Sequence, residues 1–537
     1  MAEKNHQAWT PARSVAGDRN PWSIVGVISL ATLMVVLDTT IVNVALAHIA
    51  GSLSASYDEA TWIVTSYLIA NAVIIPVSGW LADVIGRKRY YMLSVALFTG
   101  SSILCGLSPN LGFLIVARVV QGIGGGGLAP VEQSMLADTF PPSRRGLAFA
   151  AYGLVVVTGP IVGPILGGWI TDSFSWHWCF LINVPIGVAS LFLVSIFVDE
   201  PEAVRERSAQ MRRAGLRIDY IGIALAALLF GCLELTLARG QRYDWFASPM
   251  IVVCTIVGIL AFLLLIPWEL MHSEPLINLN LFRQRNFAIA SLLLLVVGVV
   301  LFGTTQFIPQ LLQEVLGYTA TTAGLALTAG GVVTIIGMPI VGVLSSRVDL
   351  RYLIGFGMCM QVWAFWAMGH LSTEMAFYNA AFVRAVQAAG LPFLFIPVTT
   401  VAYVGLRPEE NNQASALMNV VRNLGGSIGI GTVQIMLARN QQIHQLRLVE
   451  GLNPLNPNYV EATRQLSQAI TGHAPAASGA AANGPVLGTL YRQAQQQAAM
   501  LSYVDVFYLL MIIVACAIPL IFLMRKSQAG AAMQGAA

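Results

Sequence analysis

The segment IVARVVQGIGGGGLAP, residues 115–130, lacks polar side chains apart from an arginine and a glutamine three residues apart. The chain repeats this pattern as AFVRAVQAAGLPFLFIP at residues 381–397. The two arginines, Arg118 and Arg384, lie 266 residues apart (384 − 118), and a glycine follows six residues after each. Parallel repeats of helices are typical of membrane transporters, whose binding site lies between the repeats. The sequence therefore predicts two helical bundles that face one another.

The composition places the chain among membrane proteins. It is 56% hydrophobic and 10% charged, whereas a soluble chain carries roughly 25% charged residues. Because a helix needs about 20 apolar residues to cross a bilayer, the sequence predicts an all-α membrane protein of fourteen transmembrane helices. The predicted spans are 22–49, 62–82, 90–107, 111–133, 147–170, 178–198, 219–238, 248–269, 287–311, 322–345, 352–370, 377–403, 413–437 and 501–524.

The distribution of Lys and Arg predicts the orientation. With the N-terminus in the cytoplasm, 20 of the 29 basic residues fall in inside segments and six in outside segments. Four of those six lie between the last two predicted spans, at Arg439 and within the long loop 440–500, and long loops translocate regardless of charge. We therefore expect both termini in the cytoplasm. The net charge of +3 follows from this pattern and gives no reason to expect a nucleic-acid partner.

The repeat also predicts how the chain is divided. Six helices in each repeat leave one helix pair over, which we interpret as a hairpin inserted between two six-helix bundles. The predicted units are an N-terminal cytoplasmic tail (1–21), an N-terminal bundle (22–198), a cytoplasmic linker (199–218), the inserted pair (219–269), a C-terminal bundle (287–524) that includes a periplasmic loop (440–500), and a cytoplasmic tail (525–537). The ends of that loop, 458–470 and 488–507, look helical, and its middle, 473–485, looks flexible.

The loop GWLADVIGRKR at residues 79–89 resembles the cytoplasmic signature loop of the major facilitator superfamily. Its acid and basic run would pair across helix ends and against the opposite bundle, as a latch that is intact in one conformation and broken in the other. The alternative is that the basic residues only anchor the loop on the cytoplasmic side. This explains the run of basic residues at 87–89 but not the spacing of the glycines and the aspartate. The predicted latch residues are Gly79, Asp83, Gly86, Arg87 and Lys88.

The segment GLVVVTGPIVGPILGG at residues 153–168 resembles the antiporter signature of proton-coupled exporters, which uptake symporters generally lack. Proline kinks a helix, and glycine allows close contact between helices. The alternative is a helix that is kinked only for packing. The predicted kink residues are Gly159, Pro160, Gly163, Pro164 and Gly167.

The segment LDTTIVNVALAHI at residues 37–49 resembles the first-helix signature of fourteen-helix drug:proton antiporters, although that family usually has proline where this chain has Ala47 or His48. Asp38 and Arg118 lie at similar depths in a core of about 30 Å, so we expect them to meet. A buried carboxylate beside a cation is suited to carry a proton, and a static ion pair between two helices is the alternative. The predicted proton-coupling residues are Asp38, Arg118, Glu132 and Glu234. For Glu132 and Glu234, the alternative is a solvated charge near the end of a span.

Other polar residues, Asn183 among them, fall within predicted spans. They either line a substrate cavity or form hydrogen bonds between helices. The candidate cavity residues are Asn43, Asn71, Gln121, Gln306, Gln310, Arg384, Asn419 and Arg422. The GIGGGG run at 122–127 lies in a predicted span with no strand before it, so it does not fit a dinucleotide site. The chain has no ATP-binding GxxxxGK[ST] motif, metal-spaced cluster or catalytic triad. We expect no enzyme activity and no cofactor, with protons as the coupling ion.

These signatures, the fourteen spans and the segment GLRPEENNQASALMNVVRNLGGSIGIGTVQ at 405–434 together resemble the EmrB/QacA family of drug efflux pumps, and its EmrB branch in detail. The resemblance implies the major facilitator fold and export of hydrophobic toxic compounds across the bacterial inner membrane. It also implies a tripartite pump, with an EmrA-like periplasmic adaptor at loop 440–500 and a TolC-like outer-membrane channel. The alternatives are uptake or facilitated diffusion of a metabolite, and a non-transporting membrane sensor or scaffold.

Overall fold

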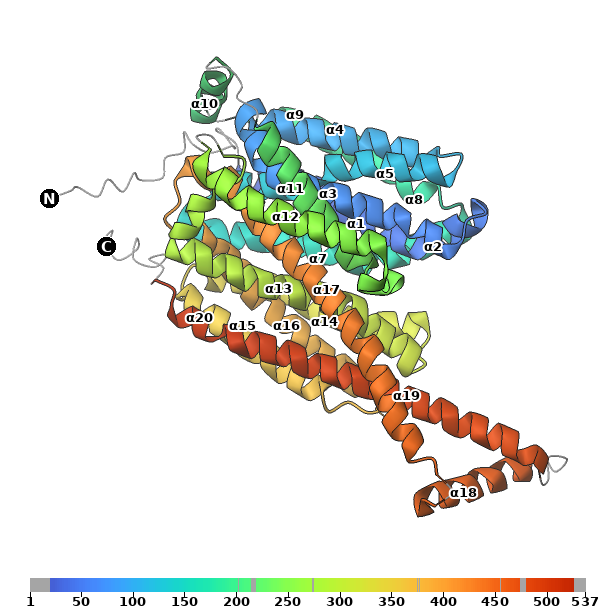
Figure 1. Ribbon diagram of the computed structural model, residues 1–537. Helices are drawn as coiled ribbons and strands as arrows, with labels where there is room; N and C mark the ends of the chain where they lie inside the picture. The colour runs from blue at the N-terminus through green and yellow to red at the C-terminus, as the bar shows by residue number, and fades with distance from the viewer. Residues whose placement is uncertain are drawn as a thin grey trace.

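The computed structural model describes residues 20–200, 202–213, 219–272, 275–373, 375, 377–453, 455–473 and 480–525. Within these ranges the chain is helical and contains no strand (Figure 1). The predicted tails 1–21 and 525–537 lie almost wholly outside the described residues, as does the end of the predicted linker, 214–218.

Each predicted span coincides with one helix or with two consecutive helices. These are α1 (Pro21–Ser52), α3 (Trp62–Ile85), α4 (Arg87–Gly106), α5 (Leu111–Gly126) with α6 (Leu128–Thr139), α7 (Pro142–Ser173), α8 (Trp178–Leu181) with α9 (Asn183–Phe197), α11 (Tyr220–Arg239), α12 (Pro249–Met271), α13 (Arg285–Gln310), α14 (Ala320–Leu344), α15 (Leu350–Met368), α16 (Phe377–Ala402), α17 (Asn411–Glu450), and α19 (Ala480–Ala517) with α20 (Pro519–Phe522). The remaining helices are α2 (Tyr57–Ala60), α10 (Glu202–Arg213) and α18 (Pro457–His473), with short helical turns at 241–243, 245–247, 279–283, 311–315 and 408–410.

Eleven helical segments of the described chain are long and apolar enough to cross a membrane. The three predicted spans outside this set coincide with α4, α15 and α17, whose hydropathy is lower. The chain is therefore a multi-pass helical membrane protein.

Local sequence explains where several helices begin. The Asn20 side chain accepts a hydrogen bond from the backbone amide of Trp22 at 3.0 Å, and Pro21 occupies the first turn of α1. The Asp219 side chain caps α11 in the same way, accepting from the amide of Gly222 at 2.8 Å. Such caps satisfy amides that have no partner within the helix. Gly86, with φ of +97°, makes the sharp turn between α3 and α4.

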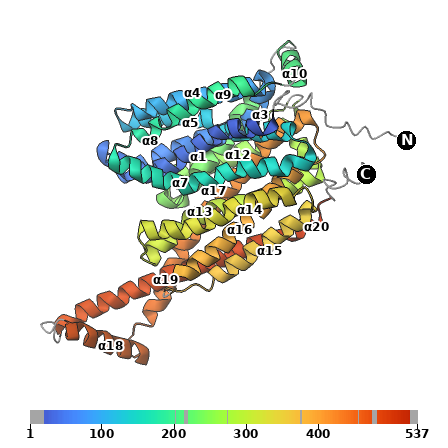
Figure 2. The ribbon, with the colours of Figure 1, turned by 180° about the vertical axis from the view of Figure 1, so that it is seen from behind.

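The helices form two packed groups (Figures 1 and 2). In the first group, α1 packs on α7 and α9, and α5 packs on α3 and α4. In the second group, α17 packs on α13 and α19, and α16 packs on α14 and α15. The groups meet where α17 contacts α3 and α6 and where α14 contacts α7. The pair α11 and α12 lies beside this junction, with α11 against both α3 and α17.

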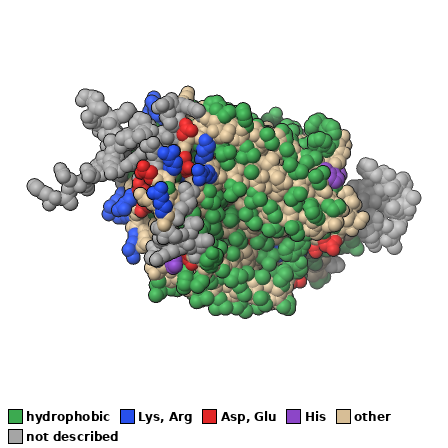
Figure 3. Space-filling view, turned by 90° about the horizontal axis from the view of Figure 1, so that it is seen from above, with side chains coloured by type: hydrophobic (Ala, Val, Ile, Leu, Met, Phe, Trp, Pro, Cys, Tyr) green, Lys and Arg blue, Asp and Glu red, His purple; other side chains and the backbone are tan. Residues whose placement is uncertain are grey.

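Charged side chains gather at one end of the molecule. Figure 3 shows Lys, Arg, Asp and Glu clustered there, whereas the rest of the visible face is mainly apolar. Helix α10 and the start of α1 lie at this end (Figure 1), which we call the α10 end. An apolar belt with charges beyond it fits a chain surrounded by lipid.

At the opposite end, helices α17, α18 and α19 extend beyond the rest of the molecule (Figure 1). The predicted helical segments 458–470 and 488–507 are confirmed as α18 and part of α19. Helix α17 continues past 440 to Glu450, so the first part of the predicted loop is helical. Residues 480–485, predicted to be flexible, are helical, and 474–479 lie outside the described residues. Asp505 joins the two long helices, accepting from Asn440 at 2.9 Å and lying 2.7 Å from the His444 ring nitrogen.

Candidate functional site

The expected contact between Asp38 and Arg118 is present. Nη1 of Arg118 in α5 donates to Oδ2 of Asp38 in α1 at 2.5 Å. The side chains are 1% and 0% exposed, respectively. An ion pair is removed from water at a cost that only further hydrogen bonds offset, so the surroundings of this pair decide whether it is stable.

Polar side chains from three further positions complete the surroundings of Asp38. Its Oδ1 accepts from the amides of Gln121 and Asn183, each at 2.9 Å. The same two amides donate to the hydroxyl oxygen of Ser102, at 3.2 and 3.0 Å. The carboxylate therefore has three donors, contributed by α5 and α9. This arrangement gives both carboxylate oxygens hydrogen-bond donors and holds α1, α4, α5 and α9 together.

Arg118 is held as firmly as its partner. Its Nε donates to the carbonyl oxygen of Ile63 at 3.1 Å, and Nη1 also donates to Oε1 of Gln121 at 2.7 Å. The guanidinium lies 4.1 Å from the ring centroid of Tyr67 in α3, a cation–π contact. These contacts orient the guanidinium toward Asp38.

Gln121, predicted as a cavity residue, is fully buried in this conformation and lies within the Asp38 network. The sequence interpretation missed Ser102 and Tyr67. Ser102 is a small polar residue in a predicted span, a weak signal, since such residues also bond to their own helix.

The second helix group has a similar arginine–glutamine pair, but this pair lacks an acidic partner. Arg384 donates to Gln387, as Arg118 does to Gln121. Gln387 in turn donates to Oε1 of Gln361 in α15 at 3.2 Å. Among the described residues, no carboxylate forms an ion pair with Arg384. The repeat thus holds one buried arginine, Arg118, and one half-buried arginine, Arg384, and among the described residues only Arg118 forms an ion pair with an acid.

The glycines of α7 pack against α1 on both sides of Asp38. A side-chain carbon at Gly159 would meet Val36, one at Gly163 would meet Thr40, and one at Gly167 would lie 3.2 Å from the Cα of Ile41. Helix α7 is continuous through both Gly-Pro pairs. The Pro164 side chain is exposed, and that of Pro160 lies outside the described residues.

At the α10 end, the predicted latch residues contact α6, α9 and α17. Nδ2 of Asn412 donates to Oδ1 of Asp83 at 2.5 Å. Arg87 forms an ion pair with Asp138 of α6, which also accepts from Nδ2 of Asn411 at 2.5 Å. Gly79 lies against the backbone of α17 at 412–413. The latch sequence therefore reaches the second group through two adjacent asparagines.

Two other predicted residues complete this region. Gly86 makes the turn before α4, and Nζ of Lys88 donates to the carbonyl oxygen of Ser195 in α9 at 2.9 Å. The hydroxyl of Ser208 in α10 donates to the backbone oxygen of Asp83 at 2.7 Å, so α10 covers the latch from outside.

Further hydrogen bonds join α6 to the first turns of α17. Ser134 donates to Oδ1 of Asn412 at 2.5 Å, and Asn419 donates to Oε1 of Gln133 at 2.9 Å. Ser415 donates to the carbonyl oxygen of Pro130. We call these contacts of α3 and α6 with residues 411–419 the gate. They close the junction of the two groups near the α10 end.

The two other candidate acids have different surroundings. Glu132 in α6 is 0% exposed and accepts a hydrogen bond from Thr32 of α1, so the alternative of a solvated charge at a span end is wrong for this residue. Glu234 in α11 is half-buried, and its Oε2 accepts from Ser427 of α17 at 2.7 Å. Asp38, Glu132 and Glu234 therefore occupy three separate places.

The remaining candidates do not form one cavity. Nη2 of Arg422 donates to Oδ1 of Asn419 at 2.6 Å, and Nε2 of Gln310 donates to Oε2 of Glu314 at 2.9 Å. Arg384 lines a separate small cavity between α13, α14, α15, α16 and α19. The others are Asn71, which is half-buried, and Asn43 and Gln306, which are exposed.

Repeated helical groups that meet at a polar junction, with a buried acid–arginine pair in one of them, are typical of membrane transporters. The family model of the Major Facilitator Superfamily matches residues 28–430. The Multidrug export protein EmrB of Escherichia coli (strain K12) is 41% identical over 432 residues, covering 80% of this chain and 83% of that protein. The Multidrug export protein EmrB of Haemophilus influenzae is 38% identical over 445 residues, with 82% and 85% covered.

The fold has solved relatives as well. The human organic anion transporter MFSD10 (TETRAN) superposes with a TM-score of 0.56 at 12% identity, covering 93% of this chain and 100% of that one. The chain belongs to the major facilitator superfamily, in the branch that contains the EmrB multidrug export proteins.

Proposed function

We propose that this chain is a proton-coupled antiporter that exports hydrophobic toxic compounds across the bacterial inner membrane. The observation that carries the proposal is the Asp38–Arg118 pair, which is sealed from water and held by Gln121 and Asn183. A carboxylate in such a site changes its protonation only when the surrounding helices rearrange. The names of the EmrB relatives support multidrug export as the transport activity.

In the proposed mechanism, a proton reaching Asp38 from the periplasm removes the charge that holds Arg118, and the Asp38 network loosens. The glycines of α7 pack on α1 beside Asp38, so a shift of α1 passes directly to α7. Helix α7 also contacts α14 of the second group. Loosening of the network thereby favours opening of the gate and return to the inward-facing state, and proton release to the cytoplasm resets the pair.

The proposed topology has fourteen spans, with α4, α15 and α17 added to the eleven apolar segments. Both termini and the α10 end lie in the cytoplasm. The chain is divided as the sequence predicts: bundles 22–198 and 287–524, the linker 199–218 and the inserted pair 219–269. The charged side chains at the α10 end (Figure 3) support this orientation.

The proposed partners are an EmrA-like periplasmic adaptor and a TolC-like outer-membrane channel. The parts of α17 and α19 that extend away from the α10 end, together with α18, form the surface that we assign to the adaptor (Figure 1). The contacts of Asp505 with Asn440 and His444 support a firm base for that extension.

Substrate-induced proton movement in everted membrane vesicles tests the proposal. We expect the wild type to release protons when a hydrophobic toxic compound is added, and Asp38→Asn to release none while remaining in the membrane. Asp172→Asn is the matched control, because this aspartate is 74% exposed at the end of α7. Full proton release by Asp38→Asn would remove Asp38 as the carrier. Flux of a metabolite without proton release would favour uptake or facilitated diffusion, and no flux of any compound would favour a sensor or scaffold.

A further inference from the structure

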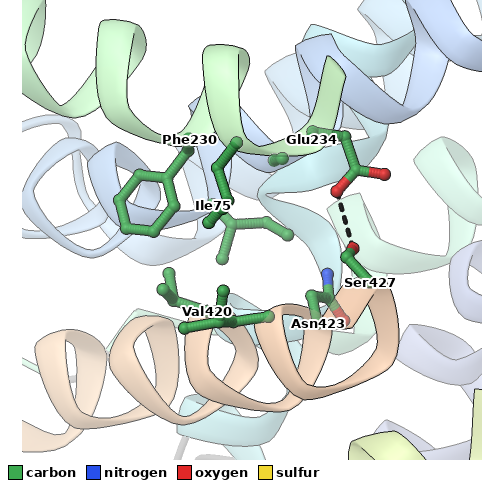
Figure 4. Close-up of a pocket in the computed structure, with 9 residues that line it drawn as sticks. Ile75, Phe230, Glu234, Val420, Asn423 and Ser427 are labelled. Carbon is green, nitrogen blue, oxygen red and sulfur yellow. Dashed lines mark hydrogen bonds between the residues drawn. The ribbon is translucent and has the colours of Figure 1, made fainter. Parts of the chain in front are cut away.

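The inserted pair is attached to the rest of the molecule at more than one depth. Within the span, Glu234 of α11 accepts a hydrogen bond from Ser427 of α17 at 2.7 Å, beside a small cavity lined by α3, α11 and α17 (Figure 4). At the α10 end, the chain enters the pair at Asp219 and leaves it just after Glu269. These two acids lie at the entry and the exit of the pair.

Asp219 is bound to both helices of the pair. It is 4% exposed and precedes the first residue of α11. Its Oδ1 accepts a hydrogen bond from the backbone amide of Gly222 at 2.8 Å. The indole Nε1 of Trp268 in α12 donates to the same oxygen at 2.9 Å and to Oδ2 at 3.1 Å. Two donors from two helices therefore fix this carboxyl group in place.

Glu269 binds the segment that leads to the second helix group. It is 3% exposed and lies in the last turn of α12. Its Oε2 accepts from the backbone amide of Ile277 at 3.1 Å. Ile277 belongs to residues 275–284, which join α12 to α13 and which we call the connector. Oε1 of Glu269 is buried and has no hydrogen-bond partner among the described residues. One oxygen thus holds the connector while the other lacks a donor.

The two carboxyl groups lie beside the same point. A side-chain carbon at Gly222 would meet Oδ2 of Asp219 and would lie 2.9 Å from Oε1 of Glu269. In the part of the chain that the structure describes, neither acid forms an ion pair with Lys, Arg or His. Two buried carboxylates at such close range repel each other strongly when both are charged, and pairs of this kind hold one proton between them. The oxygen without a donor, Oε1, lies where that proton is needed.

A proton fits this place better than a metal ion does. A metal ion needs several oxygen ligands, and the described residues contain no group of three or more His, Cys, Asp or Glu side chains that could hold one. Both oxygens of Asp219 already accept from the indole of Trp268. A proton needs no cavity and no further ligands.

Few other titratable groups lie near the pair of acids. His272 follows α12, and its ring stacks on Trp268 with the centroids 5.7 Å apart. Tyr220 is 71% exposed. The connector contributes Arg283, and α13 begins with Arg285. His272 is therefore the group whose titration has to be separated from that of the two acids.

We propose that Asp219 and Glu269 share one proton taken up from the cytoplasm, and that this proton keeps the connector bound to the inserted pair. With the proton present, Glu269 donates from Oε1 to Asp219 and keeps the amide of Ile277 on Oε2. Without it, the two charges repel each other. Glu269, which has fewer donors than Asp219, then turns away and releases the connector.

The direction of the pH dependence follows from this arrangement. Because the proton binds the closed connector better than the released one, closure is favoured at acid pH and is lost as the pH rises. Cytoplasmic pH thereby sets how firmly the inserted pair is joined to the second group. The cytoplasmic source of the proton rests on the orientation proposed above, whereas the shared proton itself depends neither on that orientation nor on Asp38.

Labelling of a cysteine in the connector tests the site in the full-length protein in lipid nanodiscs, where no proton gradient exists. Leu276 is 2% exposed, so Leu276→Cys reacts with an impermeant maleimide only when the connector is released. Met271 is 87% exposed, and Met271→Cys corrects for the effect of pH on thiol reactivity. The six native cysteines are replaced in both. We expect corrected labelling about tenfold or more faster at alkaline than at mildly acidic pH, the change that loss of one charge-assisted hydrogen bond produces.

Variants of the two acids separate the shared proton from other causes. Glu269→Gln and Asp219→Asn each place an amide donor between the two groups, so both should label slowly at either pH, whereas Glu269→Ala should label fast at either pH. His272→Gln should keep the parental pH dependence. Asp244→Asn is the matched control, because this exposed acid lies at the other end of the pair, and it should behave as its parent does.

Three results would overturn the proposal. The first is parental labelling that does not change with pH after correction. The second is fast or pH-dependent labelling in both Glu269→Gln and Asp219→Asn. The third is loss of the pH dependence in His272→Gln, which would assign the titration to the imidazole. Substrate-induced proton release is measured separately in vesicles, so failure of the antiport proposal leaves these outcomes unchanged.

Discussion

Replacing Asn412 by alanine should open the gate. The amide of this residue accepts from Ser134 and donates to Asp83, each at 2.5 Å. A buried neutral hydrogen bond contributes about 1 kcal/mol and one to a carboxylate about 1.5–3 kcal/mol, so the closed gate loses roughly 2.5–4 kcal/mol. In the open gate, water replaces both partners, and the loss therefore falls on the closed state. At 1.4 kcal/mol per factor of ten, the equilibrium shifts toward the open gate by roughly 60- to 700-fold.

A cysteine at Ala416 reports this shift. Ala416 is 2% exposed and lies on α17 against Gly79 of α3, so a thiol there becomes accessible only when the gate opens. The assay measures labelling by a membrane-impermeant maleimide in everted vesicles, with the six native cysteines replaced. We expect Asn412→Ala to label much faster than its parent. Asn440→Ala, which removes a hydrogen bond at the far end of α17, should label at the parental rate. Equal rates in Asn412→Ala and its parent would refute the gate assignment.

Two further predictions concern the surroundings of Asp38. Gly163→Ala should reduce substrate-induced proton release in vesicles, because the added carbon meets Thr40 on α1, whereas Gly168→Ala, with nothing within 4 Å, should have little effect. Gln121→Leu removes one donor to Asp38 and should lower the rate of proton release about tenfold, from the loss of roughly 1.5–3 kcal/mol in a charge-assisted hydrogen bond; normal rates with normal amounts of protein in the membrane would contradict this role.

The sequence predicts those parts of the fold that the lipid bilayer constrains. A chain in a bilayer must satisfy its backbone hydrogen bonds internally, so a long apolar run predicts a helix, and each predicted span coincides with helical structure. The sequence did not predict that α17 extends beyond 440, because the polar residues there give no hydropathy signal. The helix continues to Glu450, and His444 in this part contacts Asp505 of α19.

Less of the candidate site than of the fold could be predicted from the sequence. Depth along two helices was sufficient to bring Asp38 and Arg118 together, because helical rise is constant. The hydrogen bonds of Gln121 were not predicted, since its neighbours Ser102 and Asn183 come from helices whose rotation about their axes the sequence does not give. The gate residues Asp138 and Asn412 were missed for the same reason.

The sequence by itself determined that this protein is helical, embedded in a membrane, internally repeated and a member of a transporter family, because hydropathy, charge bias and short motifs are local properties of the chain. The tertiary structure alone decided which polar groups meet. It placed Asp38 within a network from four helices, closed the gate through Asn411 and Asn412, and set Glu234 of the inserted pair into a cavity beside Ser427. These contacts depend on helix rotation and packing, which distant parts of the chain fix together.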